Sequence, residues 1–184
     1  MTYFVIGDNH FGDARILRYC RNDKFSTVDE MNRYMIEKWN KTVKRNDTLF
    51  INGDLSRYTD ENDYKFISKL NGRKILIRGN HDNMDNECYY SNGIYKVYDY
   101  PVMYEYLLIT HEPYFVNNNS PFVNVYAHVH NNANYKLVSS CGYCTSVEVN
   151  NYTPVKMELI QKLISDERKK IDLSLFEYII GCDE

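Results

Sequence analysis

Several features that would assign this chain of 184 residues to a common non-enzymatic class are missing. No apolar run is long enough to span a membrane, and residues 1–4 lack the basic and then apolar pattern of a signal peptide. The net charge of −3 argues against a broad face for binding nucleic acid. We find no internal repeat or low-complexity linker. We therefore expect one domain over residues 1–184, with the 43% hydrophobic share supplying its core.

A disulfide scaffold is also excluded by the cysteine pattern. The five cysteines are an odd number, and a chain of this length does not need disulfide bonds for stability. Cys141 and Cys144 form a lone CxxC, and no second pair completes a structural zinc site. We interpret them as two reduced cysteines near a strand and a turn, with a zinc-binding or redox role as the alternative. Together with the missing signal pattern, this predicts a cytoplasmic protein.

All five histidines, by contrast, lie in short polar motifs, each of which follows a run of β-type residues. The motifs are Gly7-Asp8-Asn9-His10, Gly79-Asn80-His81-Asp82, Thr110-His111-Glu112-Pro113 and Ala127-His128-Val129-His130, with Gly53-Asp54 between the first two. Chance would scatter histidines over helices, loops and surface. Their placement where α/β proteins gather catalytic groups indicates an enzyme with a metal centre.

The first half of the chain has the pattern of a parallel sheet covered by helices. Apolar runs predict strands at residues 3–6, 48–51 and 74–77, and the intervening segments predict helices at 14–20, 27–46 and 60–70. The longest helix has a capping box at Thr27–Glu30 and an apolar stripe of Met31, Met35, Trp39 and Val43, which we interpret as core. This order is β-α-β-α-β.

The second half predicts shorter strands. They are expected within 94–106, at 107–109 and 123–126, near 137–138 and at 146–149. Pro154 suits the first turn of a helix that runs to about Lys170, and a further short helix is expected at 173–180.

The five motifs end five predicted strands, and such ends converge on one rim of a sheet. Side chains two residues apart, as in Asp8 with His10 and His128 with His130, point to the same side of an extended chain. The candidate ligands are Asp8, His10, Asp54, Asn80, His111, His128 and His130. They are too many for one ion and fit two ions that share a carboxylate. Imidazole and oxygen donors without thiolate suit Mn²⁺ as the first choice, with Fe, Ni, Co or Zn as alternatives.

Two ions about 3.5–4 Å apart can hold a hydroxide between them and clamp a phosphate in line with it. His81 is then the remaining histidine, available to supply a proton to the leaving group. Asp82 is a plausible partner that fixes the tautomer of His81, or it could cap a helix beginning near Met84. Arg57, three residues after Asp54, could bind the substrate phosphate or be a solvated or carboxylate-paired arginine.

In this order, the motifs D-x-H, GD, GNHD, H and HxH resemble those of the calcineurin-like metallophosphoesterase superfamily. The flanking segments are similar to those of a group of small bacterial and phage proteins described as predicted phosphoesterases or their inactivated derivatives. These segments are residues 8–12, 25–32 and 146–155. The similarity covers nearly the whole chain.

The resemblance implies an α/β/β/α sandwich of two mixed sheets with the site at the strand ends. It implies that one metal is bound by Asp8, His10 and His130, and the other by Asn80, His111 and His128. Asp54 would bridge the two metals. His81 would lie beside the substrate phosphate as general acid or transition-state stabiliser, with Asp82 orienting it.

Two positions depart from the pattern of that group. Asp13 stands where the group has histidine, which puts a substrate-side role of this position in doubt, although Asp13 could still bind a metal water. Ala127 stands in place of the usual glycine before HxH. All the ligand positions are kept, so we do not interpret the chain as an inactivated derivative.

We therefore expect a two-metal phosphoesterase that attacks a small phosphoester with a bridging hydroxide. Nucleotides are among the candidate substrates. Diesters are slightly favoured over monoesters, because Arg57 is the one good auxiliary cation for a dianion. One alternative is a non-catalytic, metal-bound interaction module. Another is a nuclease, which would need a groove that the acidic charge balance does not support.

Overall fold

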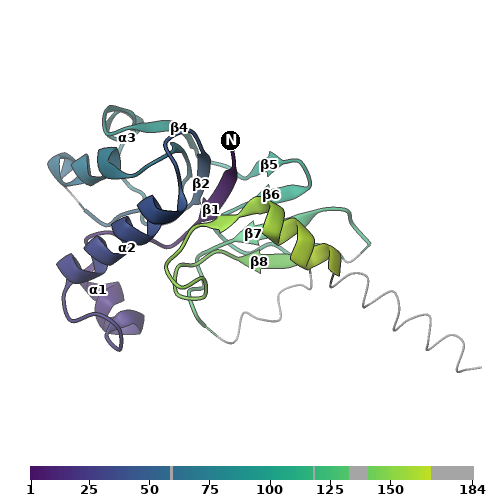
Figure 1. Cartoon of the computed structure of the whole chain (residues 1–184), viewed down its shortest axis with the longest axis horizontal. Helices are drawn as coiled ribbons and strands as arrows, with labels where there is room; N and C mark the ends of the chain where they lie inside the picture. The colour runs from purple at the N-terminus through teal and green to yellow at the C-terminus, as the bar shows by residue number, and fades with distance from the viewer. Residues whose placement is uncertain (59, 118, 133–140, 167–184) are drawn as a thin grey trace, which may run out of the picture.

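The computed structural model describes residues 1–58, 60–117, 119–132 and 141–166, and two mixed β-sheets organise them (Figure 1). The first sheet has the strand order β4-β3-β2-β1-β9 and is built from β1 (Tyr3–Ile6), β2 (Thr48–Asn52), β3 (Arg73–Ile77), β4 (Ile94–Tyr98) and β9 (Val155–Lys156). The second has the order β5-β6-β7-β8 and is built from β5 (Val102–Tyr104), β6 (Leu107–Ile109), β7 (Val123–Tyr126) and β8 (Gly142–Cys144).

Strands β1 to β4 are parallel, as the β-α-β-α-β pattern predicts. The connection from β1 to β2 contains α1 (Ala14–Ile16), η1 (Leu17–Arg21) and α2 (Val28–Thr42), and η2 (Glu61–Lys69) connects β2 to β3. The short helix α3 (Asn86–Ser91) precedes β4. In the second sheet β6, β7 and β8 are parallel, and β5 is antiparallel to β6. The carboxyl ends of β1, β3, β6 and β7 therefore carry the histidine motifs, and the end of β2 carries Gly53-Asp54.

Alternating side chains of the first sheet pack into two different cores. Phe4 and Ile6 of β1 pack with the helices, whereas Val5 between them packs against the second sheet. Helices α2 and α3 lie on one side of the first sheet, and the second sheet lies on the other with helix 157–166 beside it (Figure 1). The expected α/β/β/α sandwich is confirmed. Among the described residues no helix has the length and apolar character needed to cross a membrane.

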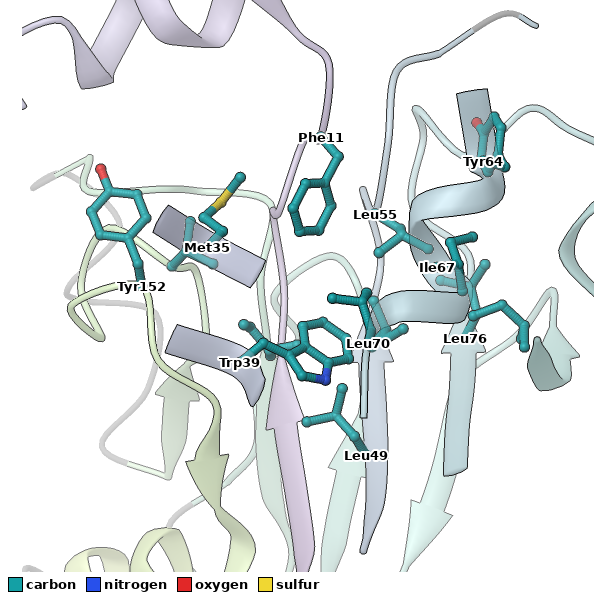
Figure 2. Packing of buried hydrophobic residues seen from close by; sticks show 14 of the residues in the cluster. Phe11, Met35, Trp39, Leu49, Leu55, Tyr64, Ile67, Leu70, Leu76 and Tyr152 are labelled. Carbon is teal, nitrogen blue, oxygen red and sulfur yellow. The ribbon is translucent and has the colours of Figure 1, made fainter. Parts of the chain in front are cut away.

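Helix α2 begins and packs as its sequence predicts. The Thr27 hydroxyl accepts a hydrogen bond from the Glu30 amide, and the Glu30 carboxylate accepts one from the Ser26 amide. Met35 and Trp39 from α2 lie over the first sheet among Leu49 and the other labelled core residues (Figure 2). The buried indole of Trp39 donates to the carbonyl of Asn71, which satisfies its one polar atom.

The segment 60–70 is helical as expected, but η2 is a 3₁₀ helix of nine residues. Runs of this kind rarely exceed four residues. The buried positions explain the difference, because Tyr64, Ile67 and Leu70 recur every third residue and all three pack into the core (Figure 2). A period of three matches the three residues per turn of a 3₁₀ helix.

Other elements differ from the expected ones. Residues 14–20 form a short α-helical turn followed by the π-helical η1. The strand expected at 146–149 is wrong: the strand is β8 at 142–144, and Ser146 then makes an isolated bridge to Gly7 as the chain crosses to the first sheet. The chain after Pro154 first forms β9, which covers the edge of β1, and the helix begins at residue 157. The elements expected near 137–138 and at 173–180 lie outside the described residues.

Trp39→Ala should lower the free energy of unfolding by about 3–5 kcal/mol, because it leaves a cavity in the core and removes the hydrogen bond to Asn71. Urea denaturation followed by circular dichroism measures the loss. Glu37→Ala, an exposed change on the same helix, is the control and should stay within about 0.5 kcal/mol of the parent. A Trp39→Ala variant as stable as this control would contradict the packing described.

Candidate metal centre

Five of the seven residues expected to bind metal share a strained backbone conformation. Asp8, His10, Asp54, His128 and His130 have φ values of 55°, 50°, 54°, 71° and 52°. Left-handed φ is uncommon for residues other than glycine and tends to persist at functional sites. Among the described non-glycine residues only three others have positive φ, so this conformation is concentrated at the strand ends.

The first cluster joins the loop after β1 to the loop after β7. One ligand atom each from Asp8, His10 and His130 lies within 4.8 Å of the others. The Asp8 carboxylate is fixed by two donors, the Ser146 hydroxyl at 2.5 Å and the His128 amide at 3.0 Å. This is the set that the family resemblance implies for one metal.

The second cluster joins the loops after β3, β6 and β7. His111 Nε2 lies 2.9 Å from Asn80 Oδ1, and His128 Nδ1 lies 3.1 Å from both of these atoms. On its other side the His111 ring has Nδ1 3.0 Å from the Asn52 carbonyl. A proton on Nδ1 would donate to that carbonyl and leave Nε2 free as a ligand.

Asp54, after β2, lies between the two clusters. Its Oδ2 is 3.3 Å from His10 Nε2 in the first cluster and 3.5 Å from His111 Nε2 in the second. Its Oδ1 accepts a hydrogen bond from the His81 amide at 2.9 Å. One carboxylate oxygen therefore faces both clusters, which is the geometry required of a bridging ligand.

The chemistry of these donors fits divalent transition-metal ions. Both ring nitrogens of His10 are buried without a hydrogen bond of normal geometry, although carboxylates of Asp13 and Asp54 lie 3.6 and 3.3 Å away. Burial by itself would lower the pKa of His10, but these carboxylates outweigh it and raise the pKa to about 9. Buried carboxylates that stabilise a cation at this position would also stabilise a metal ion.

Cys20 forms a further cluster with His130 and Glu148, which we do not assign to a metal. Burial raises the pKa of the Cys20 thiol to about 12, and only the thiolate is a good ligand. Arg21, 2.6 Å from the Glu148 carboxylate, already supplies the positive charge there.

His81 and Arg57 lie together at the edge of the clusters. The Arg57 guanidinium contacts His81 Nδ1, and His81 Nε2 lies 4.0 Å from Asp54 Oδ2. Arginine can only donate, so a hydrogen bond from Arg57 to Nδ1 would leave the ring proton on Nε2. Burial is the main reason that the pKa of His81 is lowered, which also favours the neutral ring.

Asp13, at the position where the related group has histidine, contacts both His10 and Arg57. Its carboxylate accepts from the Arg15 and Ile16 amides and so caps α1. The other oxygen lies 3.6 Å from His10 Nδ1 and 3.7 Å from Arg57 Nε. Asp13 therefore orients a ligand histidine and a basic side chain at once.

Asp82 has partners other than the expected one. Its fully buried carboxylate accepts hydrogen bonds from the Asp54, Leu55 and Gly79 amides, and no hydrogen bond joins it to His81 within the described chain. The N-cap of α3 is Asp85, so Asp82 does not cap that helix. Burial, with the nearby charge of Asp54, raises the pKa of Asp82 to about 6. Asp82 acts on the site by fixing the loop that carries Asp54.

Other polar side chains surround the candidate clusters. Arg78 is 2.9 Å from Asp99, and Tyr114 lines a hollow beside His111. Arg15 lines the hollow next to Arg57 and His81. Cys144 ends β8, with its sulfur 3.2 Å from the Ser146 hydroxyl.

Sequence reasoning missed a buried ion pair beneath the first cluster. Arg21 is fully buried and donates to the carbonyls of Asp8 and Asn9 at 2.6 and 2.9 Å. It also donates to the Glu148 carboxylate, which lies 3.0 Å from His130 Nδ1. A lone arginine and an acid 127 positions apart gave no local signal. The spacing of Ser146 and Glu148, two residues apart in a predicted strand, was the one usable clue.

Gly53 and Ala127 are explained by close packing. Gly53 has φ 92°, and a Cβ there would overlap the His111 ring. Ala127 is fully buried, and its methyl group occupies the space that a side chain at Gly7 would need. The alanine before HxH is thus accommodated by the glycine before Asp8.

Arg21→Met should lower the free energy of unfolding by about 3–5 kcal/mol, because it leaves the Glu148 charge buried and uncompensated. The double variant Arg21→Met, Glu148→Gln should recover part of the loss. Arg33→Met on the exposed surface of α2 is the matched control. If Arg21→Met changes stability no more than this control in urea denaturation, the ion pair has no structural role.

The same ion pair predicts a dependence on pH. Burial would raise the pKa of Glu148, but the hydrogen bond from His130 and the charge of Arg21 lower it from 4.5 to about 2. A carboxyl group whose pKa is lower in the folded than in the unfolded chain stabilises the fold at pH values above its unfolded-state pKa. This contribution is lost as the pH falls towards the folded-state pKa. The stability difference between the parent and Glu148→Gln should therefore be larger at pH 6 than at pH 3. Urea denaturation at both values tests this, and an unchanged difference would contradict it.

Comparisons with known proteins identify the family and the fold. The family model for calcineurin-like phosphoesterases matches residues 1–177. The uncharacterized protein MJ1445 of Methanocaldococcus jannaschii is 34% identical over 168 residues, which cover 88% of this chain and 90% of that protein. The crystal structure of AQ665 from Aquifex aeolicus, a protein of unknown function, has a similar fold at a TM-score of 0.68 and 22% identity, covering 88% of this chain and 98% of that one.

The nuclease MPE of Pseudomonas putida was also found, with a TM-score of 0.42 and 24% identity over 70% of this chain and 61% of the nuclease. The family match spans most of the chain, and the matched residues include both candidate clusters. The chain is a member of the calcineurin-like phosphoesterase family.

Proposed function

We propose that this protein is a two-metal phosphoesterase that hydrolyses phosphodiesters in preference to monoesters. The observation that carries the proposal is Asp54, whose Oδ2 lies 3.3 and 3.5 Å from histidines of two separate clusters. Asp8, His10 and His130 would hold one ion, and Asn80, His111 and His128 the other. Mn²⁺ is the first candidate, with Fe, Ni, Co and Zn as alternatives.

The ions, when bound, lower the pKa of water and neutralise charge on the phosphoryl oxygens. In the reaction a water oxygen gives up a proton to solvent and bonds to phosphorus while the bond to the leaving oxygen breaks, and that oxygen takes up a proton from solvent water and leaves as an alcohol. His81 would donate a hydrogen bond from Nε2 to a phosphoryl oxygen. Arg57 keeps Nδ1 unprotonated, so His81 acts as a neutral transition-state stabiliser in this proposal. Arg57 adds one positive charge, which suits a monoanionic diester.

His81→Ala should lower kcat by about 10²-fold while leaving metal content unchanged, because it removes one donor to the transition state. The loss should be equal for a diester with a p-nitrophenolate leaving group and one with an alkoxide leaving group. Metal content is measured by elemental analysis, and Asn83→Ala, an exposed change two residues away, is the control.

Two other outcomes would change the assignment of His81. A much larger loss with the alkoxide leaving group would show that His81 is a general acid. Loss of metal from His81→Ala would show that it is a ligand.

The competing function is a metal-bound interaction module that binds a partner without catalysis. Turnover of bis-p-nitrophenyl phosphate separates the two, with each of Mn, Fe, Co, Ni and Zn added in turn. We expect hydrolysis that depends on added metal and is lost in Asp54→Asn, which cannot bridge two ions as a carboxylate. Absence of turnover with every metal, at full metal occupancy, would sink the enzyme proposal.

A further inference from the structure

Two hollows open on either side of Tyr19 and both reach the candidate metal centre. The first, of about 620 Å³, is lined by Arg15, Arg18 and Arg57 together with His81 and His130, and we call it the arginine hollow. The second, of about 670 Å³, is lined by His128, His130, Asn131 and Asn132, and we call it the asparagine hollow. Tyr19 and His130 belong to both. A substrate phosphate at the metals would thus have space for one substituent on each side of Tyr19.

The turn that carries Tyr19 is fixed to the metal loop. In the π-helical η1, Leu17 and Arg21 are buried, whereas Arg18 and Tyr19 point outwards, with Tyr19 84% exposed. Arg21 hydrogen-bonds the carbonyls of Asp8 and Asn9, so η1 is tied to the residues beside the first cluster. Such π turns are frequent at functional sites. The turn that carries the exposed ring of Tyr19 is therefore held beside the candidate metal centre.

Among the described residues, the positive charges in the arginine hollow outnumber the negative ones. Asp13 is the one acidic residue among the described residues that line it, and it lies 3.8 Å from Arg15 and 3.7 Å from Arg57. Arg18 forms no ion pair with any described residue. Its guanidinium is therefore available to an anionic group of a ligand.

We propose that Arg18 and Tyr19 form a nucleotide subsite, and that the substrate is a dinucleotide or short single-stranded oligonucleotide phosphodiester. This inference rests on the proposed phosphoesterase function. The scissile diester lies at the metals, one nucleoside enters each hollow, and a base stacks on Tyr19, since aromatic rings stack on any base. Arg18 binds the next phosphate along the chain. A monoester or a simple alkyl diester would leave one hollow empty.

The kinetic test compares three diesters in the metal-loaded protein. These are methyl p-nitrophenyl phosphate, the dinucleotide TpT and its 5′-phosphorylated form pTpT. We expect kcat/KM to rise from the first to the last, with pTpT about tenfold above TpT. Arg18→Ala should abolish the preference for pTpT over TpT. Tyr19→Ala should lower kcat/KM for both dinucleotides about tenfold or more and change methyl p-nitrophenyl phosphate little.

A binding measurement makes the test independent of turnover. Isothermal titration calorimetry with a pTpT analogue, in which a methylene group replaces the scissile bridging oxygen, should show weaker binding in both variants. Arg33→Ala on α2 and Tyr106→Ala in the turn between β5 and β6, where this ring is 61% exposed, are the matched controls.

The outcomes distinguish the two proposals. Binding that depends on Tyr19 without turnover of any diester would support the subsite and overturn the phosphoesterase function. A second outcome is turnover of the small diester together with no binding of the dinucleotide analogue, or with equal binding in the parent and both variants. That outcome would overturn the subsite and leave the phosphoesterase function standing.

Discussion

The buried side chain of Asn52 is the interaction on which the assembly of this site depends. From the end of β2 this side chain donates to the carbonyl of Thr110 and accepts from the hydroxyl of Thr145. The main-chain carbonyl of Asn52 faces the ring of His111. These contacts join the first sheet to two segments of the second, directly below the metal-binding loops. The two sheets also share the core in which Val5, Phe50 and Ile77 of the first sheet pack against the second. The polar contacts of Asn52 add direction to this packing, so that the strand ends of both sheets form a single rim.

In the loops above Asn52, several candidate ligands have a left-handed backbone conformation, which is unfavourable. Hydrogen bonds with buried polar groups hold this conformation. Asp8 and Asp54 both have left-handed φ, and each is held by hydrogen bonds from or to fully buried partners. Arg21 binds the carbonyls around Asp8, and Asp82 accepts the amide of Asp54. The cost of strain at the loops is thus offset by charged and polar groups that are themselves satisfied only in this conformation. Preorganised ligands are the consequence.

Local patterns in the sequence predicted the parallel sheet and the grouping of the seven candidate ligands, because strand periodicity and motif position are properties of short segments. They did not predict the 3₁₀ character of η2, which follows from a spacing of three between Tyr64, Ile67 and Leu70 that can also be accommodated by an α-helix. The pairing of Arg21 with Glu148 was also unpredictable, because it joins residues 127 positions apart and depends on where the chain crosses between sheets. Helices and strands are recognised by a periodic pattern of apolar residues in the sequence, and a polar pair far apart in the chain produces no such pattern.

The contact between Gly7 and Ala127 has a consequence for how such a chain can change over time. One methyl group fills a space between the two loops that no second side-chain atom can enter. Alanine at 127 is therefore tolerated only while residue 7 is glycine. The Oδ1 atom of Asn52 would also overlap a Cβ at residue 7, so glycine at 127 would not by itself make room for a larger residue there. Substitutions at residue 7 thus depend on side chains from two other segments that are far away in the sequence.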